Sequence, residues 1–320
     1  MSVVAFDTSN YTTSIAYFNG SHGENCSRLL PVKAGELGLR QSDAVFHHTK
    51  SLPELSGRLF SHICADEITG IGVSTKPRWV DGSYMPCFLV GYSHAKLMAE
   101  TLHVPLIECS HQQGHVAAAL WSAGRMDLMD QPHLAWHLSG GTTELLLVEP
   151  DNGNVKCTCI GGTTDISAGQ LIDRTGQLLN LPFPAGKELD RISKESECTE
   201  AYSVKCQGLT FSLSGMQNKA QQYYLSSGSA ADTAAFTLRT IGKAVRKATE
   251  NALKEYPGLP IVFSGGVASN SMLREMLQPL DPVFAKPEYS TDNALGVAVL
   301  AYRLLEGSYV PGSIDHCTNK

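Results

Sequence analysis

The chain carries the stretch Leu134-Ala135-Trp136-His137-Leu138-Ser139-Gly140-Gly141-Thr142-Thr143, in which an apolar strand pattern ends in small polar residues. Residues 144–149 then return as a second strand. The chain begins in a similar way, because residues 3–7 lead into Thr8-Ser9-Asn10 and a second strand follows at 13–18. Two copies of strand, small polar turn and strand predict an α/β protein with an internal duplication of two similar lobes.

Both turns could hold phosphate oxygens. Gly140 and Gly141 let the backbone come close to a ligand, and the neighbouring hydroxyls can donate hydrogen bonds to it. A plain Gly-Gly hairpin turn is the alternative for these residues, and a plain first hairpin is the alternative at residues 8–10. The recurrence of the turn in both halves favours the ligand-binding interpretation.

A third glycine turn follows the strand pattern of residues 259–263. Gly265 and Gly266 stand between this strand and a helix pattern, and such a turn can bind an anion or nucleotide at the helix N-terminus. Near the end of the chain, Asp292 precedes an apolar helix. It occupies a typical N-cap position, and it is also a carboxylate that could bind a metal.

Two histidines, His111 and His115, follow the strand pattern of residues 104–109. Residues four apart lie on one face of a helix, and neutral imidazoles are common ligands of zinc, iron and copper. Ligands also tend to bind beyond the carboxyl ends of strands in open α/β sheets. The pair therefore indicates a metal site, although two surface histidines at a helix start are the alternative.

Length and periodicity indicate the domain organisation. A chain of 320 residues exceeds the usual single core, so two lobes are expected at residues 1–130 and 131–320. The final helix can belong to either lobe, because it can cross back to the first. A short buried strand is expected at 68–74. Apolar spacing predicts helices at 47–64, 88–102, 171–181 and 230–256.

Net charge and cysteine content limit which classes of function fit this chain. A net charge of -6 and a pI near 6.0 make any contact with RNA local or shared with a partner. The basic residues Arg239, Lys243 and Arg246 form either a solvated helix face or an RNA-facing stripe. Nine cysteines without a CxxC pair favour free cytosolic thiols. We expect no signal peptide, no membrane span and a cytoplasmic location.

Six motifs in collinear order resemble the TsaD family, the threonylcarbamoyl-adenosine synthases of tRNA. The family motifs H-x-E-G-H, V-S-G-G-H-T and F-D-K…Y-P-G-G correspond to HQQGH, HLSGGTT and IDR…FPAG in this chain. The motifs F-S-F-S-G, A-G-G-V-A-A-N and C-T-D-N correspond to FSLSG, SGGVASN and STDN. A single match of this kind would be weak evidence of homology, whereas six matches in the same order are strong evidence.

This resemblance implies a two-lobed actin/Hsp70/sugar-kinase fold with duplicated RNase H-like sheets and one divalent metal per chain. His111, His115 and Asp292 match the family's metal ligands, and His137 stands where the archaeal branch has a metal-binding Tyr. The expected site is therefore three histidines and one aspartate. Iron and zinc are both chemically reasonable for such ligands.

The resemblance also implies an adenylate or ATP-type nucleotide. The residues expected to bind it are Leu138, Ser139, Gly140, Gly141, Asp173, Gly186, Asp190, Gly265, Gly266 and Asn270. The family reaction transfers threonylcarbamoyl from its adenylate to an adenosine beside the tRNA anticodon. It implies contact with tRNA through a complex, with TsaB- or TsaE-like subunits as possible partners.

Five acids of the family are neutral here, which indicates a divergent paralogue. The replacing residues are Tyr11, Thr12, Gln113, Ile166 and Gln170, while Asp165 keeps its acid. Neither Tyr nor Gln replaces a carboxylate as proton acceptor at neutral pH. Two alternatives therefore stay open, namely a metalloenzyme for another adenylate or carbamoyl substrate and a non-catalytic nucleotide-binding subunit.

Overall fold

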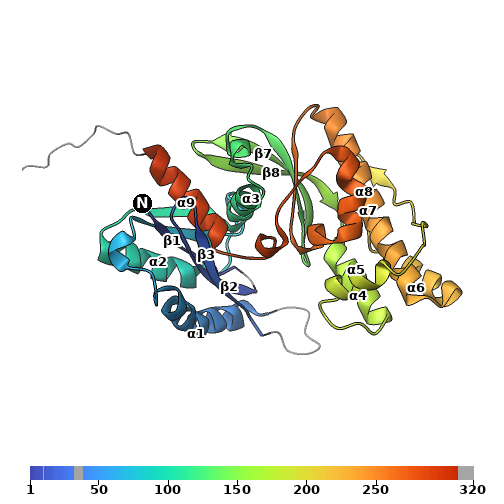
Figure 1. Cartoon of the computed structure of the whole chain (residues 1–320), viewed down its shortest axis with the longest axis horizontal. Coiled ribbons are helices and arrows are strands. Elements are labelled where there is room, and N and C mark those ends of the chain that lie inside the picture. The colour runs from blue at the N-terminus through green and yellow to red at the C-terminus, as the bar shows by residue number, and fades with distance from the viewer. Residues whose placement is uncertain (10, 32–38, 309–320) are drawn as a thin grey trace, which may run out of the picture. The chain divides into compact units, whose positions relative to one another are not determined.

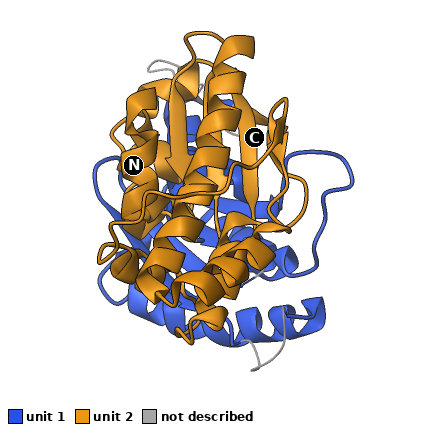
Figure 2. Ribbon diagram, turned by 90° about the vertical axis from the view of Figure 1, so that its right-hand side faces the viewer, with its two compact units in different colours: residues 1–117, 151–154, 292–320 blue, residues 118–150, 155–291 orange. Residues whose placement is uncertain are grey.

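The computed structural model describes residues 1–9, 11–31 and 39–308, so Asn10 of the first turn lies outside it. The chain forms two compact units, shown in separate colours in Figure 2. Unit 1 comprises residues 1–117, 151–154 and 292–320, and unit 2 comprises residues 118–150 and 155–291. The lobe limits expected from the sequence, 1–130 and 131–320, stay a prediction.

Unit 1 is built on a five-stranded sheet with the order β3-β2-β1-β4-β5. Its strands β1, β2 and β3 are labelled in Figure 1. Strands β1, β2 and β3 pair antiparallel, whereas β4 and β5 continue the sheet in parallel from β1. The strands are β1 (Val3–Asp7), β2 (Thr12–Phe18), β3 (Gly23–Leu29), β4 (Gly70–Lys76) and β5 (Leu106–Ser110).

Alternate residues of these strands face different helices. Val4 and Ile71 belong to the apolar core beneath α1 (Gln41–Leu59) and α2 (Phe88–Leu102). Their neighbour Gly72 faces α9 (Leu295–Ser308), since a Cβ added to it would lie 2.9 Å from Ala301 Cβ. The period of two along a strand thus places α1 and α2 on one face of the sheet and α9 on the other.

Unit 2 is built on a seven-stranded sheet with the order β12-β11-β6-β7-β8-β10-β9. Its strands are β6 (His133–Leu138), β7 (Thr143–Asp151), β8 (Asn154–Thr163), β9 (Cys206–Gln207), β10 (Thr210–Phe211), β11 (Ile261–Ser264) and β12 (Val283–Phe284). Its helices are α4 (Ala168–Leu178), α5 (Gly186–Ser193), α6 (Met216–Ser227), α7 (Ala230–Glu255) and α8 (Ser271–Leu277). The remaining helix, α3 (His111–Ser122), runs from unit 1 into unit 2.

The two sheets share one topology, which confirms the duplication predicted from the repeated turns. The order β3-β2-β1-β4-β5 in unit 1 corresponds to β8-β7-β6-β11-β12 in unit 2. In both, the first two strands of the motif pair antiparallel, and the two later strands join in parallel. The α/β fold class and its duplicated sheets follow from this correspondence.

Some helices begin or end at residues other than those expected from the sequence, and capping residues account for such a difference. The α2 helix has the expected limits, but α4 begins at Ala168 because Ser167 caps it, three residues before the expected Leu171. The helix expected at 47–64 begins at Gln41 and ends at Leu59. Within the described residues, no helix is long and apolar enough to cross a membrane.

A buried histidine on α1 makes unit 1 sensitive to acid. His48 is fully buried, its Nδ1 lies 2.8 Å from Thr13 Oγ1, and burial lowers its pKa from 6.5 to about 4. Between these values the unfolded chain binds the proton and the folded chain does not, so stability falls as the pH drops from 6.5 towards 4. We expect a loss of about 2 kcal/mol across this window.

Urea unfolding of the wild type and of His48→Gln at pH 7 and pH 4.5 would measure this contribution. The wild type should lose more stability between the two pH values than the variant, whose Gln does not titrate. Equal losses in both proteins would contradict a neutral buried His48.

Candidate functional site

The start of α3 is fixed by a capping box that follows β5. Gln113 Oε1 accepts hydrogen bonds from Ser110 N at 2.8 Å and Ser110 Oγ at 3.0 Å, and Gln113 N donates to Ser110 Oγ at 3.2 Å. The helix therefore begins at His111, and His115 lies one turn later on the same face. The local sequence thus directs both imidazoles to one side.

Three potential metal ligands converge in unit 1. The Nε2 atoms of His111 and His115 are 2.9 Å apart, and Asp292 Oδ1 lies 3.5 Å and 3.2 Å from them, respectively. All three ligand atoms lie within 4.8 Å of one another. Donor atoms around a tetrahedral zinc ion with bonds of about 2.0–2.1 Å lie about 3.3 Å apart. The spacing and chemistry of these donors therefore fit a divalent transition metal.

Gly114 allows the carboxylate to reach the histidines. A Cβ at Gly114 would lie 3.0 Å from Val297 Cγ2, so the absence of a side chain lets α3 and α9 approach closely. Asp292 precedes α9, and Gly296 N in the first turn donates a hydrogen bond to Oδ1 of the neighbouring Asn293 at 3.2 Å. In this structure Asn293 makes the capping contact, while the Asp292 carboxylate lies against the two imidazoles.

The charges of the cluster stabilise one another. Burial lowers the pKa of His111, but the Asp7 and Asp292 carboxylates outweigh it and raise that pKa to about 10. Burial raises the pKa of Asp292, yet hydrogen bonds and charge from His111 and His115 hold it well below its ordinary value. Without a metal, His111 is thus protonated at neutral pH, and metal binding must displace that proton.

His137, expected as a fourth ligand, lies on β6 in unit 2. Its Nδ1 is 3.4 Å from Ser264 Oγ on the adjacent strand β11. The group of possible ligands found among the described residues consists of His111, His115 and Asp292. The participation of His137 in metal binding stays a prediction.

The Ser139–Gly141 turn packs directly on the start of α4. Ser139 N donates to Thr142 O at 2.8 Å, and Ser167 Oγ donates to Gly140 O at 2.6 Å. A Cβ at Gly169 would lie 2.4 Å from Gly140 Cα and 2.5 Å from Ser139 O. This contact between backbones requires glycine at 169 and holds the turn in place.

The turn after β11 packs on the end of β6. Gly265 has φ +92°, and a Cβ there would lie 2.2 Å from Leu138 O, so only glycine fits. Gly266 is exposed at the same turn. Asn270 then caps α8 by accepting a hydrogen bond from Leu273 N at 3.0 Å. The structure therefore brings Leu138, Gly265 and the Ser139–Gly141 turn together in unit 2.

The two acids expected near the nucleotide each hold the start of a helix. Asp190 Oδ1 accepts from Ser271 N at 3.1 Å and from Ser271 Oγ at 2.8 Å, which ties α5 to α8. Asp173 Oδ1 accepts from Ala185 N at 2.8 Å, directly before Gly186 begins α5. Burial raises the pKa of Asp173. Both carboxylates thus have structural partners in addition to any ligand.

Gln113 and Gln170, which replace two acids of the family, have the same role at the start of a helix. Gln170 accepts from Ser167 N at 3.0 Å and its own N donates to Ser167 Oγ at 3.0 Å, a second capping box like that of Gln113. Either Glu or Gln serves at this helix position. Neither box was predicted from the sequence, although the spacings Ser110-x-x-Gln113 and Ser167-x-x-Gln170 carry their signature.

The retained acid, Asp165, organises the loop before α6. Its Oδ1 accepts hydrogen bonds from Leu213 N at 2.8 Å and Ser214 N at 3.2 Å, and Ser212 Oγ donates to its Oδ2. These bonds lower the pKa of Asp165 to about 2, although burial acts in the opposite direction. The FSLSG motif is therefore held by an acid almost fifty residues earlier in the sequence.

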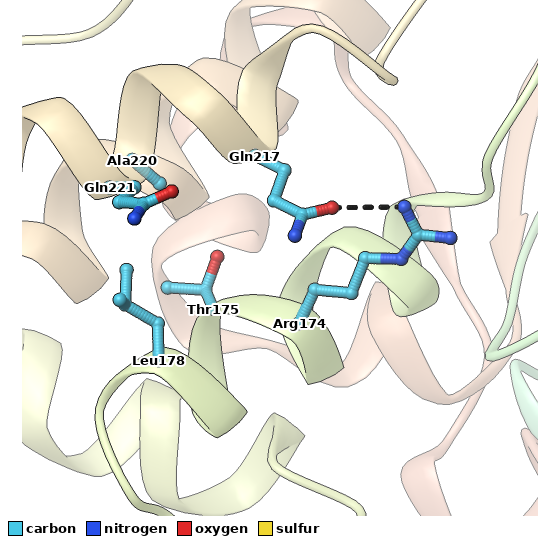
Figure 3. Close-up of a pocket in the computed structure, with 6 residues that line it drawn as sticks. All are labelled: Arg174, Thr175, Leu178, Gln217, Ala220 and Gln221. Carbon is cyan, nitrogen blue, oxygen red and sulfur yellow. Dashed lines mark hydrogen bonds between the residues drawn. The ribbon is translucent and has the colours of Figure 1, made fainter.

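A small pocket in unit 2 lies between α4 and α6 (Figure 3). Arg174 Nη1 donates to Gln217 Oε1 across it at 3.0 Å. Its lining contains neither histidine nor a carboxylate: Arg174, Thr175, Leu178, Gln217, Ala220 and Gln221. It offers no ligand set comparable to the histidine–aspartate cluster.

Solved structures of other proteins share this fold. HypF of T. kodakarensis matches with a TM-score of 0.61 at 14% identity over 96% of this chain, which spans only 48% of that protein. Component A of (R)-2-hydroxyglutaryl-CoA dehydratase from Acidaminococcus fermentans matches with a TM-score of 0.54 at 14% identity, covering 95% of this chain and 98% of that one. These likenesses confirm the actin/Hsp70/sugar-kinase fold expected from the sequence.

Sequence comparison identifies the family. The tRNA N6-adenosine threonylcarbamoyltransferase of Carboxydothermus hydrogenoformans is 32% identical over 84% of this chain and 81% of its own length. The enzyme of that name from Thermosipho africanus is 29% identical over 95% and 94%, respectively. The family model TsaD, tRNA N6-adenosine threonylcarbamoyltransferase, matches residues 37–299. This protein belongs to the TsaD family.

Proposed function

We propose that this protein transfers threonylcarbamoyl from its adenylate to the N6 amine of an adenosine beside the tRNA anticodon. The observation that carries this function is the convergence of His111, His115 and Asp292 in a chain of the TsaD family. A bound iron or zinc ion would polarise the carbamoyl carbonyl as a Lewis acid. His137 is the fourth ligand of this proposal.

The glycine turns of unit 2 are suited to the adenylate. Within the described part of the chain, the amides of Gly140 and Gly141 donate to no other residue, and both glycines are exposed. Two adjacent free amides can bind phosphate oxygens. Gly265 and Gly266 add a second turn after β11. Asp173 and Asp190 would then accept hydrogen bonds from the ribose hydroxyls.

The proposal includes partners. The net charge of -6 favours a tRNA contact that is shared with other proteins, for which TsaB- and TsaE-like subunits are the candidates. For this activity we propose a cytoplasmic location.

The test is reconstitution with threonylcarbamoyl-adenylate as the donor, tRNA and the partner subunits, followed by nucleoside analysis. We expect threonylcarbamoyl-adenosine with the wild type and a loss of at least about 100-fold with the His111→Ala, His115→Ala variant. Absence of the modified nucleoside with a metal-loaded wild type would contradict the proposal. It would favour another adenylate or carbamoyl acceptor, consistent with Tyr11 and Thr12 in place of two family acids.

A further inference from the structure

We propose that Asp7 is a positioning residue for the metal site, because its carboxylate accepts the Nδ1 proton of His111 and thereby directs the Nε2 lone pair to the metal. This inference rests on the proposed metal-dependent function. It concerns a residue that lies 104 positions before the histidine it orients.

The contact is direct and buried. Asp7 Oδ2 lies 2.8 Å from His111 Nδ1, and the side chain of Asp7 is 1% exposed. The other carboxylate oxygen, Oδ1, accepts from Ser9 N at 2.9 Å. Both oxygens of Asp7 therefore have fixed partners, which leaves the carboxylate one orientation.

The position of Asp7 is rigid. It is the last residue of β1, which pairs with β2 on one side and β4 on the other. His111 is equally constrained, because it begins α3 behind the Ser110–Gln113 capping box and meets Phe88 edge-on at 6.3 Å between ring centroids. The pair thus connects a central strand to the first turn of the ligand-bearing helix.

The chemistry requires one tautomer of His111. A neutral imidazole carries its proton on either Nδ1 or Nε2, and only the unprotonated nitrogen binds a metal. The Nε2 atom faces His115 and Asp292, so the proton must be on Nδ1. A carboxylate that accepts this proton fixes the tautomer and the ring orientation, and it makes the ligand more basic.

The Asp7→Asn variant tests the role with little change in shape. Because Ser9 N still requires an acceptor, the amide oxygen should remain there and the NH2 group should face His111. The Nδ1 atom would then have to accept, which moves the proton to Nε2 and blocks the metal. We expect the Kd for Zn²⁺, measured by chelator competition at fixed pH, to rise about 10- to 100-fold.

Two further variants separate positioning from general stability. Asp7→Glu keeps the carboxylate and should recover most of the affinity. Thr13→Val removes the 2.8 Å hydrogen bond to the buried His48 in the same unit, and it should lower stability without changing the Kd. Co²⁺ absorption bands should change in Asp7→Asn and stay unchanged in Thr13→Val.

The outcomes distinguish this inference from the proposed function. A wild-type Kd in Asp7→Asn, with lower stability alone, would overturn the positioning role and leave the transferase proposal intact. Weakened binding in Asp7→Asn supports the inference even if reconstitution with tRNA yields no product. A wild type that binds neither Zn²⁺ nor Co²⁺ would overturn both the inference and the metal-dependent part of the function.

Discussion

Purified wild-type protein is expected to contain about one iron or zinc ion per chain, and the His111→Ala, His115→Ala variant to contain none. The variant leaves only Asp292 of the three-residue cluster and the proposed fourth ligand His137, and these two donors are too few to retain a transition metal at micromolar concentration. Elemental analysis of both proteins measures the difference. Chelation of the wild type should also lower its stability, by about 3 kcal/mol where the free metal had been 100 times its Kd.

A matched histidine variant provides the control. His22 and His62 lie on exposed parts of unit 1, and neither belongs to the cluster. The His22→Ala, His62→Ala variant should therefore keep the metal. Retention of metal in the His111→Ala, His115→Ala variant would show that the ion binds elsewhere, and a metal-free wild type would make the histidines structural.

Much of the candidate site could be predicted because its signals are local. The spacing of His111 and His115 determines that they share a helix face, and the strand pattern before them places both at the carboxyl end of a strand. Asp292 could be proposed as a ligand, but the sequence alone left the N-cap alternative open. In the structure Asn293 accepts the hydrogen bond from the first turn of α9, and the ligand role of Asp292 stays a prediction.

Contacts between distant residues could not be predicted in this way. The pairing of Asp7 with His111 arises because β4 lies between β1 and β5, so it depends on the strand order of the whole sheet. No pattern near either residue carries this information. The hydrogen bonds that Leu213 N and Ser214 N donate to Asp165 could not be predicted from the sequence for the same reason.

The capping boxes change how the replaced acids are interpreted. Gln113 and Gln170 each accept a hydrogen bond at a helix start, a role that does not need charge. From the sequence, both residues are counted among the five lost acids, because their family counterparts are considered only as acids. Tyr11, Thr12 and Ile166 remain as replacements that this local role does not explain. The chain therefore diverges from the family at these three positions.

The Gly169→Ala variant is expected to destabilise unit 2 by about 3 kcal/mol. The added methyl group would lie 2.4 Å from Gly140 Cα and 2.9 Å from Gly140 N, and backbone atoms cannot move aside as a flexible side chain can. Either α4 or the Ser139–Gly141 turn must shift. Because that turn supplies the free amides proposed for the phosphate, nucleotide affinity should fall together with stability.

Gly57→Ala is the matched substitution at a helix position with open space. Gly57 lies in α1, and an added Cβ would meet no atom within 4 Å. Alanine favours helix more than glycine does, so this variant should gain about 0.5–1 kcal/mol. Denaturant unfolding of both variants therefore tests whether their free energies of unfolding change in opposite directions. A Gly169→Ala variant that is as stable as the wild type, or more stable, would contradict close packing of the turn on α4.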